Sequence, residues 1–273
     1  MQTFRSIALL LITALVVIAC QSVQTTQPGA VGVARKQTMS TMVSAADIDR
    51  SAAQDYNAEL ARARASNTLN SDPAQTVRVR KIAARLIDQT TAFRPDAKSW
   101  PWAINVETSK EINAYCMPGG RIMVYTGLIE KLNLTDAELA TVMAHEISHA
   151  LREHSREQVS RQMDQQVGLT ALAGLAGLSD VSVQLASVLS DVTFNLPHSR
   201  VQESEADEIG LELMARAGYD PNAAISLWKK MSASGQGSTP GFLSTHPSSQ
   251  SRTSDLQALL PKVMPLYQAT IPK

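Results

Sequence analysis

Net charge, cysteine and long apolar runs are all scarce in this 273-residue sequence. Lys+Arg and Asp+Glu both total 25, so the chain has no excess charge to attract a phosphate backbone or an anionic lipid surface. We therefore expect no nucleic-acid partner. Hydrophobic residues make up 44% of the chain, which is enough to bury a sizeable core and form a globular protein.

The two cysteines are Cys20 and Cys116. Cys20 is interpreted below as a site of lipid attachment, which leaves Cys116 as the single thiol. A single thiol cannot form an internal disulfide, so the stability of the fold must come from packing. We interpret Cys116 as a small buried hydrophobic residue rather than a redox group.

The N-terminal apolar run, residues 7–19, is shorter than the roughly 20 residues that cross a bilayer as a helix. It follows Arg5, and this order predicts a signal peptide over residues 1–19. The segment ends in Val-Ile-Ala-Cys, which resembles the lipobox of bacterial lipoproteins and implies that Cys20 is acylated, with palmitate for example. An ordinary signal peptide or a membrane anchor is the alternative.

If Cys20 is lipidated, the mature chain lies in the periplasm, held to a membrane by its lipid. Gln21 is not the aspartate that retains lipoproteins in the inner membrane, so the inner face of the outer membrane is expected. Residues 20–38 are small and polar, a composition that cannot build a core, and we predict a lipidated flexible tether. Residues 39–273 then form a single domain with a helical N-terminal part.

The predicted fold class is α+β and mainly helical. Residues 44–66 and the stretch after Asp72 and Pro73 have helical composition and start signals. Three short runs rich in β-forming residues follow, at 104–106, 112–117 and 122–125, and residues 118–120 form a turn between the last two. We expect a hairpin there.

An apolar segment interrupts the second half of the chain. Residues 164–197 carry few charges, and residues 167–178 are apolar on all sides, which favours a buried helix over a membrane span. A loop that contacts a membrane is the alternative.

Residues 141–154, TVMAHEISHALREH, place His145 and His149 four residues apart with Glu146 between them. The capping-box spacing of Thr135 and Glu138 predicts that a helix begins just before them. On a helix, residues four apart share a face, so two imidazoles can bind one ion, and neutral imidazoles favour zinc. Glu146 lies beside that face, where it can take a proton from an attacking water. The alternative is a polar stretch on a solvated helix.

A catalytic zinc requires a third protein ligand. His154 is five residues past His149, about 500° of helical rotation, and so falls off the ligand face. In the helix expected after residue 199, the spacing predicts a solvated stripe, and this stripe consists of Glu205, Glu208 and Glu212.

Glu203 and Asp207 share the other side of that helix with Ala206, Gly210 and Met214. Buried unpaired carboxylates are costly, so inward acids need a cation. Glu203 is therefore the candidate third ligand, and Asp207 could accept the Nδ1–H of a ligand histidine. A salt bridge to Arg200 or Arg216 is the alternative.

Four ordered stretches, residues 113–132, 144–154, 197–214 and 244–252, resemble the HtpX-like, Ste-type (CAAX-protease-related) family of zinc metallopeptidases. The resemblance extends over roughly residues 75 to 255 and is nearest to the periplasmic lipoprotein branch of LoiP- and BepA-like proteins. It implies a gluzincin-type fold, with the H-E-x-x-H helix, a small sheet and a second helix that carries the third ligand.

The same resemblance implies the roles of the site residues. One zinc ion per chain would be held by His145, His149 and Glu203, with Glu146 as the general base. His246 would occupy the fourth metal position at rest and withdraw when a substrate arrives. Because transmembrane helices of the membrane-embedded members are not evident, prenylated substrates are not implied.

Two further roles are open at this point. His198 or Arg200 could stabilise the oxyanion of the transition state, or either could be purely structural. Residues 122–125 could hold a substrate backbone by strand addition, and the alternative is an ordinary internal strand.

We therefore expect a zinc-dependent endopeptidase of the bacterial periplasm that acts on unfolded or outer-membrane proteins in envelope quality control. The main alternative is a zinc-stabilised periplasmic chaperone with little proteolysis, and an anchored structural lipoprotein is a third possibility. Glu146 favours the enzyme, since a purely structural zinc has no need of a general base.

Overall fold

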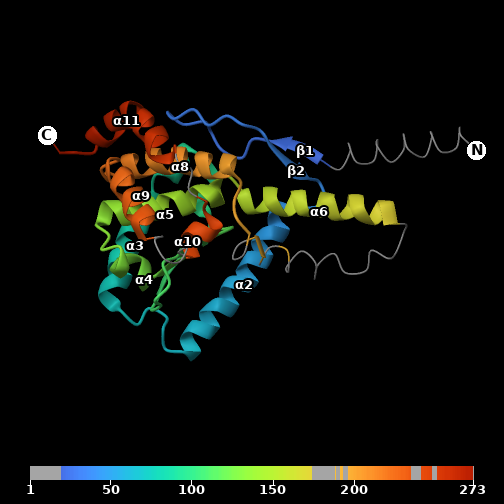
Figure 1. Ribbon diagram of the computed structural model, residues 1–273, viewed down its shortest axis with the longest axis horizontal. Coiled ribbons are helices and arrows are strands. Elements are labelled where there is room, and N and C mark those ends of the chain that lie inside the picture. The colour runs from blue at the N-terminus through green and yellow to red at the C-terminus, as the bar shows by residue number, and fades with distance from the viewer. Residues whose placement is uncertain are drawn as a thin grey trace, which may run out of the picture.

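The computed structural model describes residues 20–173, 188, 191–192, 196–234, 241–247 and 251–272, with side chains of the first range described as far as residue 164. The predicted signal peptide, residues 1–19, lies outside the described residues. The described part is mainly helical and carries two small sheets (Figure 1). The prediction of a mainly helical α+β fold is therefore correct.

The larger sheet has the strand order β3-β5-β4, formed by β3 (Ala103–Glu107), β4 (Ala114–Met117) and β5 (Arg121–Tyr125). β4 and β5 form the expected antiparallel hairpin, and β3 runs parallel to β5 on its other side. Gly119 and Gly120 make the turn with φ of 78° and 82°, a region that favours glycine.

The helices begin where their capping residues predict. Ser44 caps α2 (Ala45–Ala65), and Asp72 caps α3 (Pro73–Ile87), with Pro73 at the first helical position. Thr135 and Glu138 form the complete capping box of α5 (Asp136–Leu151). These caps accept hydrogen bonds from N–H groups of the first turn, which fixes the start of each helix.

Two helices dominate the core around the H-E-x-x-H motif. α5 packs along α8 (Arg200–Arg216), and the two lie side by side in Figure 1. α9 (Ala223–Ser234) and α11 (Arg252–Gln268) cover them from one end, and β4 packs against α5. The short helices α4 (Thr126–Lys131), α10 (Gly241–Thr245), η1 (Thr90–Ala92) and η2 (Pro95–Ser99) complete the described part.

The N-terminal segment, residues 20–38, differs from the predicted flexible tether. β1 (Cys20–Val23) and β2 (Gln37–Ser40) pair as an antiparallel hairpin, and the loop between them runs over α8 towards α11 (Figure 1). Val31 and Val33 are buried in the main core at 4% and 5% exposure. The composition of this segment did not predict its packing. Two valines, Val31 and Val33, and the ion-paired Arg35 are enough to hold it against the surface of the helices.

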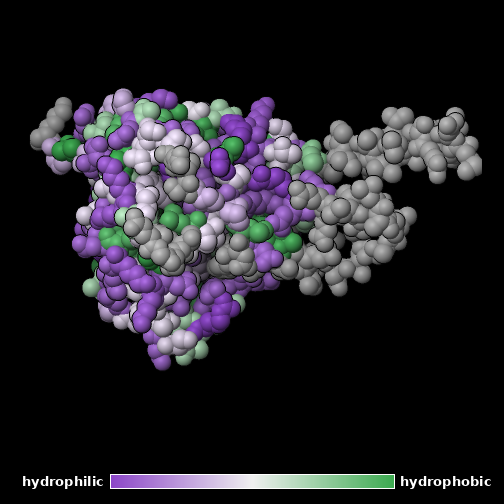
Figure 2. Space-filling view, in the orientation of Figure 1, coloured by the Kyte–Doolittle hydropathy of each residue, from purple (hydrophilic) through white to green (hydrophobic). Residues whose placement is uncertain are grey.

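α6 (His154–Ala173) covers the beginning of the apolar segment 164–197, and most of the rest of that segment lies outside the described residues. The helices that are described include none with the length and apolar character required to cross a membrane. Hydrophilic and hydrophobic residues are interspersed on the face that Figure 2 shows.

Candidate metal centre

The motif residues of α5 point into the protein rather than into solvent. His145, Glu146 and His149 are exposed by only 1%, 3% and 4%, so the interpretation as a solvated helical face is wrong. The helix is buried on nearly every side because α8, α9, β4 and α3 all pack against it. A buried, polar helical surface requires partners for its side chains.

α8 supplies two carboxylates to that surface. Glu203 is 4% exposed and lies opposite both motif histidines. Asp207, one turn further, places Oδ1 3.0 Å from His145 Nδ1. Gly210 allows this close approach, because a Cβ there would lie 3.0 Å from the backbone nitrogen of His145.

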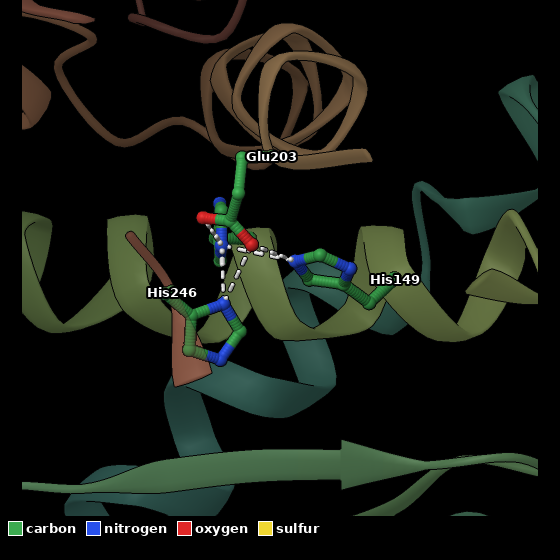
Figure 3. Close-up of side chains that lie close together, drawn as sticks. His149, Glu203 and His246 are labelled. Atoms are coloured by element: carbon green, nitrogen blue, oxygen red, sulfur yellow. Dashed lines mark hydrogen bonds and ion pairs between the residues drawn. The ribbon is translucent and has the colours of Figure 1, made fainter. Parts of the chain in front are cut away.

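Four side chains converge on one point: His145, His149, Glu203 and His246. Figure 3 shows the last three of them pointing toward one another. His145 Nε2 lies 3.1 Å from His149 Nε2 and 3.2 Å from His246 Nδ1. Glu203 Oε1 lies 3.3 Å from His149 Nε2 and 3.0 Å from His246 Nδ1. Ligands about 2.1 Å from a zinc ion form a tetrahedron with edges of about 3.4 Å, which these spacings resemble.

The hydrogen bonds of the two motif histidines determine which ring nitrogens carry protons. His145 Nδ1 faces Asp207, so it must donate. His149 Nδ1 lies 2.8 Å from His154 Nδ1, and His154 Nε2 in turn faces Glu205. A neutral His154 donates to Glu205 through Nε2, so its Nδ1 accepts from His149.

In their neutral forms, His145 and His149 therefore direct the lone pairs of both Nε2 atoms at each other and at the Glu203 carboxylate. Such a cluster of acceptors is repulsive unless a cation lies between them. Without a metal ion that cation is a proton, because burial lowers the pKa of His145 but Glu203 and Asp207 outweigh this effect and raise the pKa to about 9. Two imidazoles and a carboxylate are ligands that suit zinc. The donor set and its spacing thus fit the ion that the sequence predicted.

Glu146 lies beside this cluster. Its Oε1 is 3.4 Å from His246 Nε2 and accepts no hydrogen bond from any described residue. Burial raises the pKa of Glu146, although His246 and His145 oppose the shift. A small pocket opens there, lined among others by Glu146, Cys116 and His198.

His198 and Arg200, the two candidates for oxyanion stabilisation, lie in different places. The ring of His198 stacks on His149 with centroids 4.0 Å apart and borders the small pocket. Arg200 is exposed at the start of α8 and lines a separate cavity on the other side of Glu203. The structure therefore brings His198, and not Arg200, to the side of the cluster where Glu146 lies.

Sequence reasoning missed Arg252, at the start of α11. Its guanidinium is buried, donates to Asp207 Oδ1 at 2.7 Å, and lies 3.2 Å from Glu203 Oε2. It also packs 3.4 Å from the centre of the Trp228 ring. Arg252, rather than Arg200 or Arg216, is therefore the arginine that pairs with the two inward acids. Its signal was available, because it ends the 244–252 stretch that carries the resemblance.

The rotation argument for His154 holds only while the helix continues. α5 ends at Leu151, and Glu153 adopts a φ of 52°, which turns the chain back. His154 is thereby placed behind His149 as a hydrogen-bond partner and not as a fourth metal-facing group. This contact could not be predicted from the sequence, because the end of α5 had not been placed between His149 and His154.

The predicted solvated stripe of α8 is wrong for two of its three members. Glu205 and Glu212 are 5% and 0% exposed, whereas Glu208 is partly exposed. Both buried carboxylates bind the N-terminal segment: Glu205 binds Arg35, and Glu212 accepts from the backbone nitrogen of Val31. The stripe could not be identified as buried because the segment that covers it was predicted to be a tether.

Two expectations about the sheet are also settled. β5, proposed for strand addition, lies in the centre of the sheet and pairs on both sides, so it is an internal strand. The strand next to the metal-facing cluster is β4, which is an edge strand of the described three-stranded sheet and lines the small pocket. Cys116, on β4, is buried as expected.

Comparison with known proteins matches residues 73–260 to the family model described as peptidase family M48. The mitochondrial metalloendopeptidase OMA1 of Schizosaccharomyces pombe is 35% identical over 218 residues, which cover 79% of this chain and 62% of that protein. OMA1 of Bos taurus is 32% identical over 220 residues, covering 74% and 40% of the two chains.

A bacterial relative is similar over a comparable share of the chain. The beta-barrel assembly-enhancing protease of Escherichia coli is 27% identical over 216 residues, which cover 74% of this chain and 42% of that protein. The chain thus spans less than two thirds of the length of each of these three relatives. Mitochondrial and bacterial proteins both match, so the comparison does not select the periplasmic lipoprotein branch.

Proposed function

Because the chain belongs to peptidase family M48, we propose that it is a zinc-dependent endopeptidase that cleaves unfolded polypeptides. The observation that carries the proposal is the convergence of His145, His149 and Glu203, with the two imidazole Nε2 atoms 3.1 Å apart and facing the Glu203 carboxylate. This arrangement needs a cation, and it lies beside a buried glutamate that is free to accept a proton.

His145, His149 and Glu203 would hold the zinc ion, which would supply Lewis-acid polarisation of the scissile carbonyl. Glu146 Oε1 takes the proton of the attacking water and returns it to the leaving amine. Burial of Glu146 supports this role, because a raised pKa brings a carboxylate closer to the basicity that proton transfer at neutral pH requires.

Other residues position these groups. Asp207 fixes the tautomer of His145, and Arg252 holds Asp207 and Glu203 in place. His198 borders the pocket and is the remaining candidate for a hydrogen bond to the oxyanion. β4 borders the same pocket as Glu146 and is the strand nearest to where an extended substrate would lie.

His246 occupies the fourth corner of the cluster (Figure 3). We propose that it caps the metal position at rest and withdraws when substrate binds. His246 directly follows the short helix α10. This position supports the proposal, because a residue in a connecting segment moves more easily than a residue within a core helix. The cap would keep basal proteolysis low.

We propose further that the protein is a lipoprotein of the bacterial periplasm, anchored through Cys20 to the inner face of the outer membrane. The lipobox-like residues 17–20 support this location, and the name of the Escherichia coli relative refers to assembly of beta-barrels. Labelled palmitate should enter the wild-type protein and not Cys20→Ser. An unlabelled wild-type protein in the soluble periplasmic fraction would contradict the anchor.

The experiment that tests the peptidase is metal analysis combined with cleavage of casein and of an unfolded porin. We expect one zinc ion per chain in the full-length protein and in Glu146→Gln, and cleavage slower by about 10²- to 10⁴-fold in the variant. A wild-type protein that holds zinc and prevents porin aggregation, yet cuts neither substrate, would support the chaperone alternative and overturn the endopeptidase.

A further inference from the structure

A buried chain of hydrogen bonds connects His149 to the N-terminal segment. His149 Nδ1 lies 2.8 Å from His154 Nδ1, and His154 Nε2 lies 3.0 Å from Glu205 Oε2. Arg35, between the β1–β2 hairpin strands, binds the same carboxylate. This series of hydrogen bonds thus runs from a metal-facing histidine through His154 of α6 and Glu205 of α8 to Arg35.

Arg35 forms ion pairs with two carboxylates, those of Glu157 and Glu205. Its Nε and Nη2 donate to the two oxygens of Glu205 at 2.7 and 2.9 Å. Its Nη1 and Nη2 donate to the two oxygens of Glu157 at 2.7 and 3.0 Å. Bidentate pairing fixes the plane of each carboxylate as well as its position.

Arg152 completes the cluster from the end of α5 and is fully buried. It donates to Glu205 Oε1 at 3.0 Å and to the backbone oxygen of Arg35 at 3.0 Å. Glu205 therefore has two guanidinium partners: Arg35 lies in the N-terminal segment, and Arg152 also donates to Thr26 Oγ1 and to the backbone oxygen of Arg35 in that segment. Loss of Arg35 removes two of the donors that fix the orientation of the Glu205 carboxylate towards His154.

The orientation of Glu205 matters for His149 because each hydrogen bond in the chain determines the next. Glu205 Oε2 accepts a hydrogen bond from the Nε2–H of His154, which leaves the His154 Nδ1 lone pair as an acceptor. His149 must then keep its proton on Nδ1 and direct the Nε2 lone pair towards Glu203. Partners of this kind orient metal-binding histidines and raise metal affinity.

We propose that Arg35 is a positioning residue for His149, acting through Glu205 and His154, so that the N-terminal segment is a working part of the metal centre. This inference rests on the proposed function, since it assumes that His149 binds the metal ion. Arg35 orients the partner of His149 as Arg252 orients the partner of His145. The difference is that Arg35 acts through two residues, Glu205 and His154, whereas Arg252 acts through Asp207.

Glu212 provides a matched control within the same contact surface. Its Oε2 accepts from the backbone nitrogen of Val31 at 2.9 Å, and its Oε1 pairs with Arg216. Glu212 therefore holds the N-terminal segment at a second point that has no connection to His154. Glu212→Gln should loosen the segment while leaving the hydrogen bonds of His149 intact.

The test measures zinc affinity by chelator competition in full-length protein purified in detergent, below the unfolding temperature of each metal-free variant. We expect Arg35→Gln to bind zinc about 10- to 100-fold more weakly than wild type, and Glu212→Gln to stay within about threefold. His154→Gln should weaken zinc binding to a similar extent as Arg35→Gln, with no further loss in the double variant. The absorption spectrum of the cobalt-substituted protein should change in Arg35→Gln alone of the two segment variants.

Wild-type zinc affinity in Arg35→Gln would overturn the proposal, and so would equal losses in Arg35→Gln and Glu212→Gln, which would indicate a general effect on stability. If Arg35→Gln fails to fold, wild-type zinc affinity in the His154→Gln variant overturns it equally. A wild-type protein that binds zinc but cleaves nothing would refute the peptidase while leaving this comparison of affinities valid.

Discussion

Glu203 and Glu205 stand two residues apart on α8, and the helix therefore directs them to sides about 200° apart. Glu203 faces the two motif histidines, whereas Glu205 binds Arg35, Arg152 and His154. Both are buried. The side chains differ in what surrounds them rather than in how far they are exposed, so burial alone does not identify the metal ligand.

Glu203→Ala should lose most of the bound zinc, because it removes the anionic ligand and leaves two imidazoles to hold the ion. The matched control is Glu208→Ala on the same helix, since Glu208 is partly exposed and, within the described part of the chain, accepts a hydrogen bond from Ser204. Glu205→Ala is unsuitable as a control, because Glu205 belongs to the buried ion cluster. Equal zinc content in Glu203→Ala and Glu208→Ala, measured by elemental analysis, would refute the assignment.

His246→Ala should bind zinc nearly as well as wild type and cleave unfolded substrates faster. Removing the fourth side chain opens the position where water and substrate must enter. A gain of roughly tenfold would correspond to a resting contact worth about 1.4 kcal/mol. The measurement is the initial rate on casein at equal zinc content. A variant that keeps its zinc and fold but gains no rate would assign His246 to substrate binding or structure.

At this scale the sequence predicted the residues of the cluster well and their outer partners poorly. His145, Glu146 and His149 follow from a local motif, and Glu203 and Asp207 follow from helical periodicity. Arg35 has no such local signal and Arg252 is marked only by the resemblance of residues 244–252, because each reaches its partner through tertiary packing of a distant segment. His154 was correctly excluded as a ligand, but its contact with His149 could not be predicted because it depends on where α5 ends.

At the scale of elements, the metal centre depends on the distance between α5 and α8. Gly210 sets this distance, since a Cβ there would lie 3.0 Å from His145 N and 3.2 Å from Ala144 C. Both are backbone atoms of a buried helix, which cannot move aside as a flexible side chain can. A larger residue at 210 must therefore push α8, with Glu203, away from the histidines.

Gly210→Ala should weaken zinc binding and lower the stability of the metal-free protein. Overpacking typically costs about 1–3 kcal/mol, and the better helix propensity of alanine offsets about 1 kcal/mol of it. Gly241→Ala is the control, since the nearest contact of its Cβ would be 3.7 Å. Thermal unfolding and zinc affinity measure the two effects. Wild-type values in Gly210→Ala would show that the helix contact tolerates a methyl group.

Helix and strand positions were the most predictable part of the fold. Ser44, Asp72 and Thr135 mark helix starts through local hydrogen bonds, and the Pro-Gly-Gly turn marks the hairpin. The order of strands was not predictable, because the parallel pairing of β3 with β5 is set by packing across the sheet. That order decided which strand edge faces the metal centre.

At the scale of the whole molecule, the N-terminal segment, residues 20–38, is part of the folded domain. The sequence predicted a domain beginning at residue 39, whereas the structure packs residues 20–38 against α6, α8 and α11. If Cys20 carries a lipid, the anchor therefore joins the folded part directly, without a flexible spacer. The metal centre would then be held at a fixed distance from the membrane.

A chain that begins at residue 39 should be much less stable than one that begins at residue 20. The truncation uncovers apolar surface under Val31 and Val33 and leaves Glu157 and Glu205 without Arg35. Glu205 keeps Arg152 and His154, whereas Glu157 loses its arginine. Removing one partner of a fully buried ion pair typically costs about 3–5 kcal/mol, which is an upper bound here because Arg35 is partly exposed, against the roughly 5–15 kcal/mol that stabilises a domain. We expect the shorter chain to unfold at a clearly lower temperature or to aggregate, in thermal unfolding followed by circular dichroism. Equal unfolding midpoints for the two chains would show that residues 20–38 are a tether after all, and that the contacts of Arg35 contribute nothing to the fold.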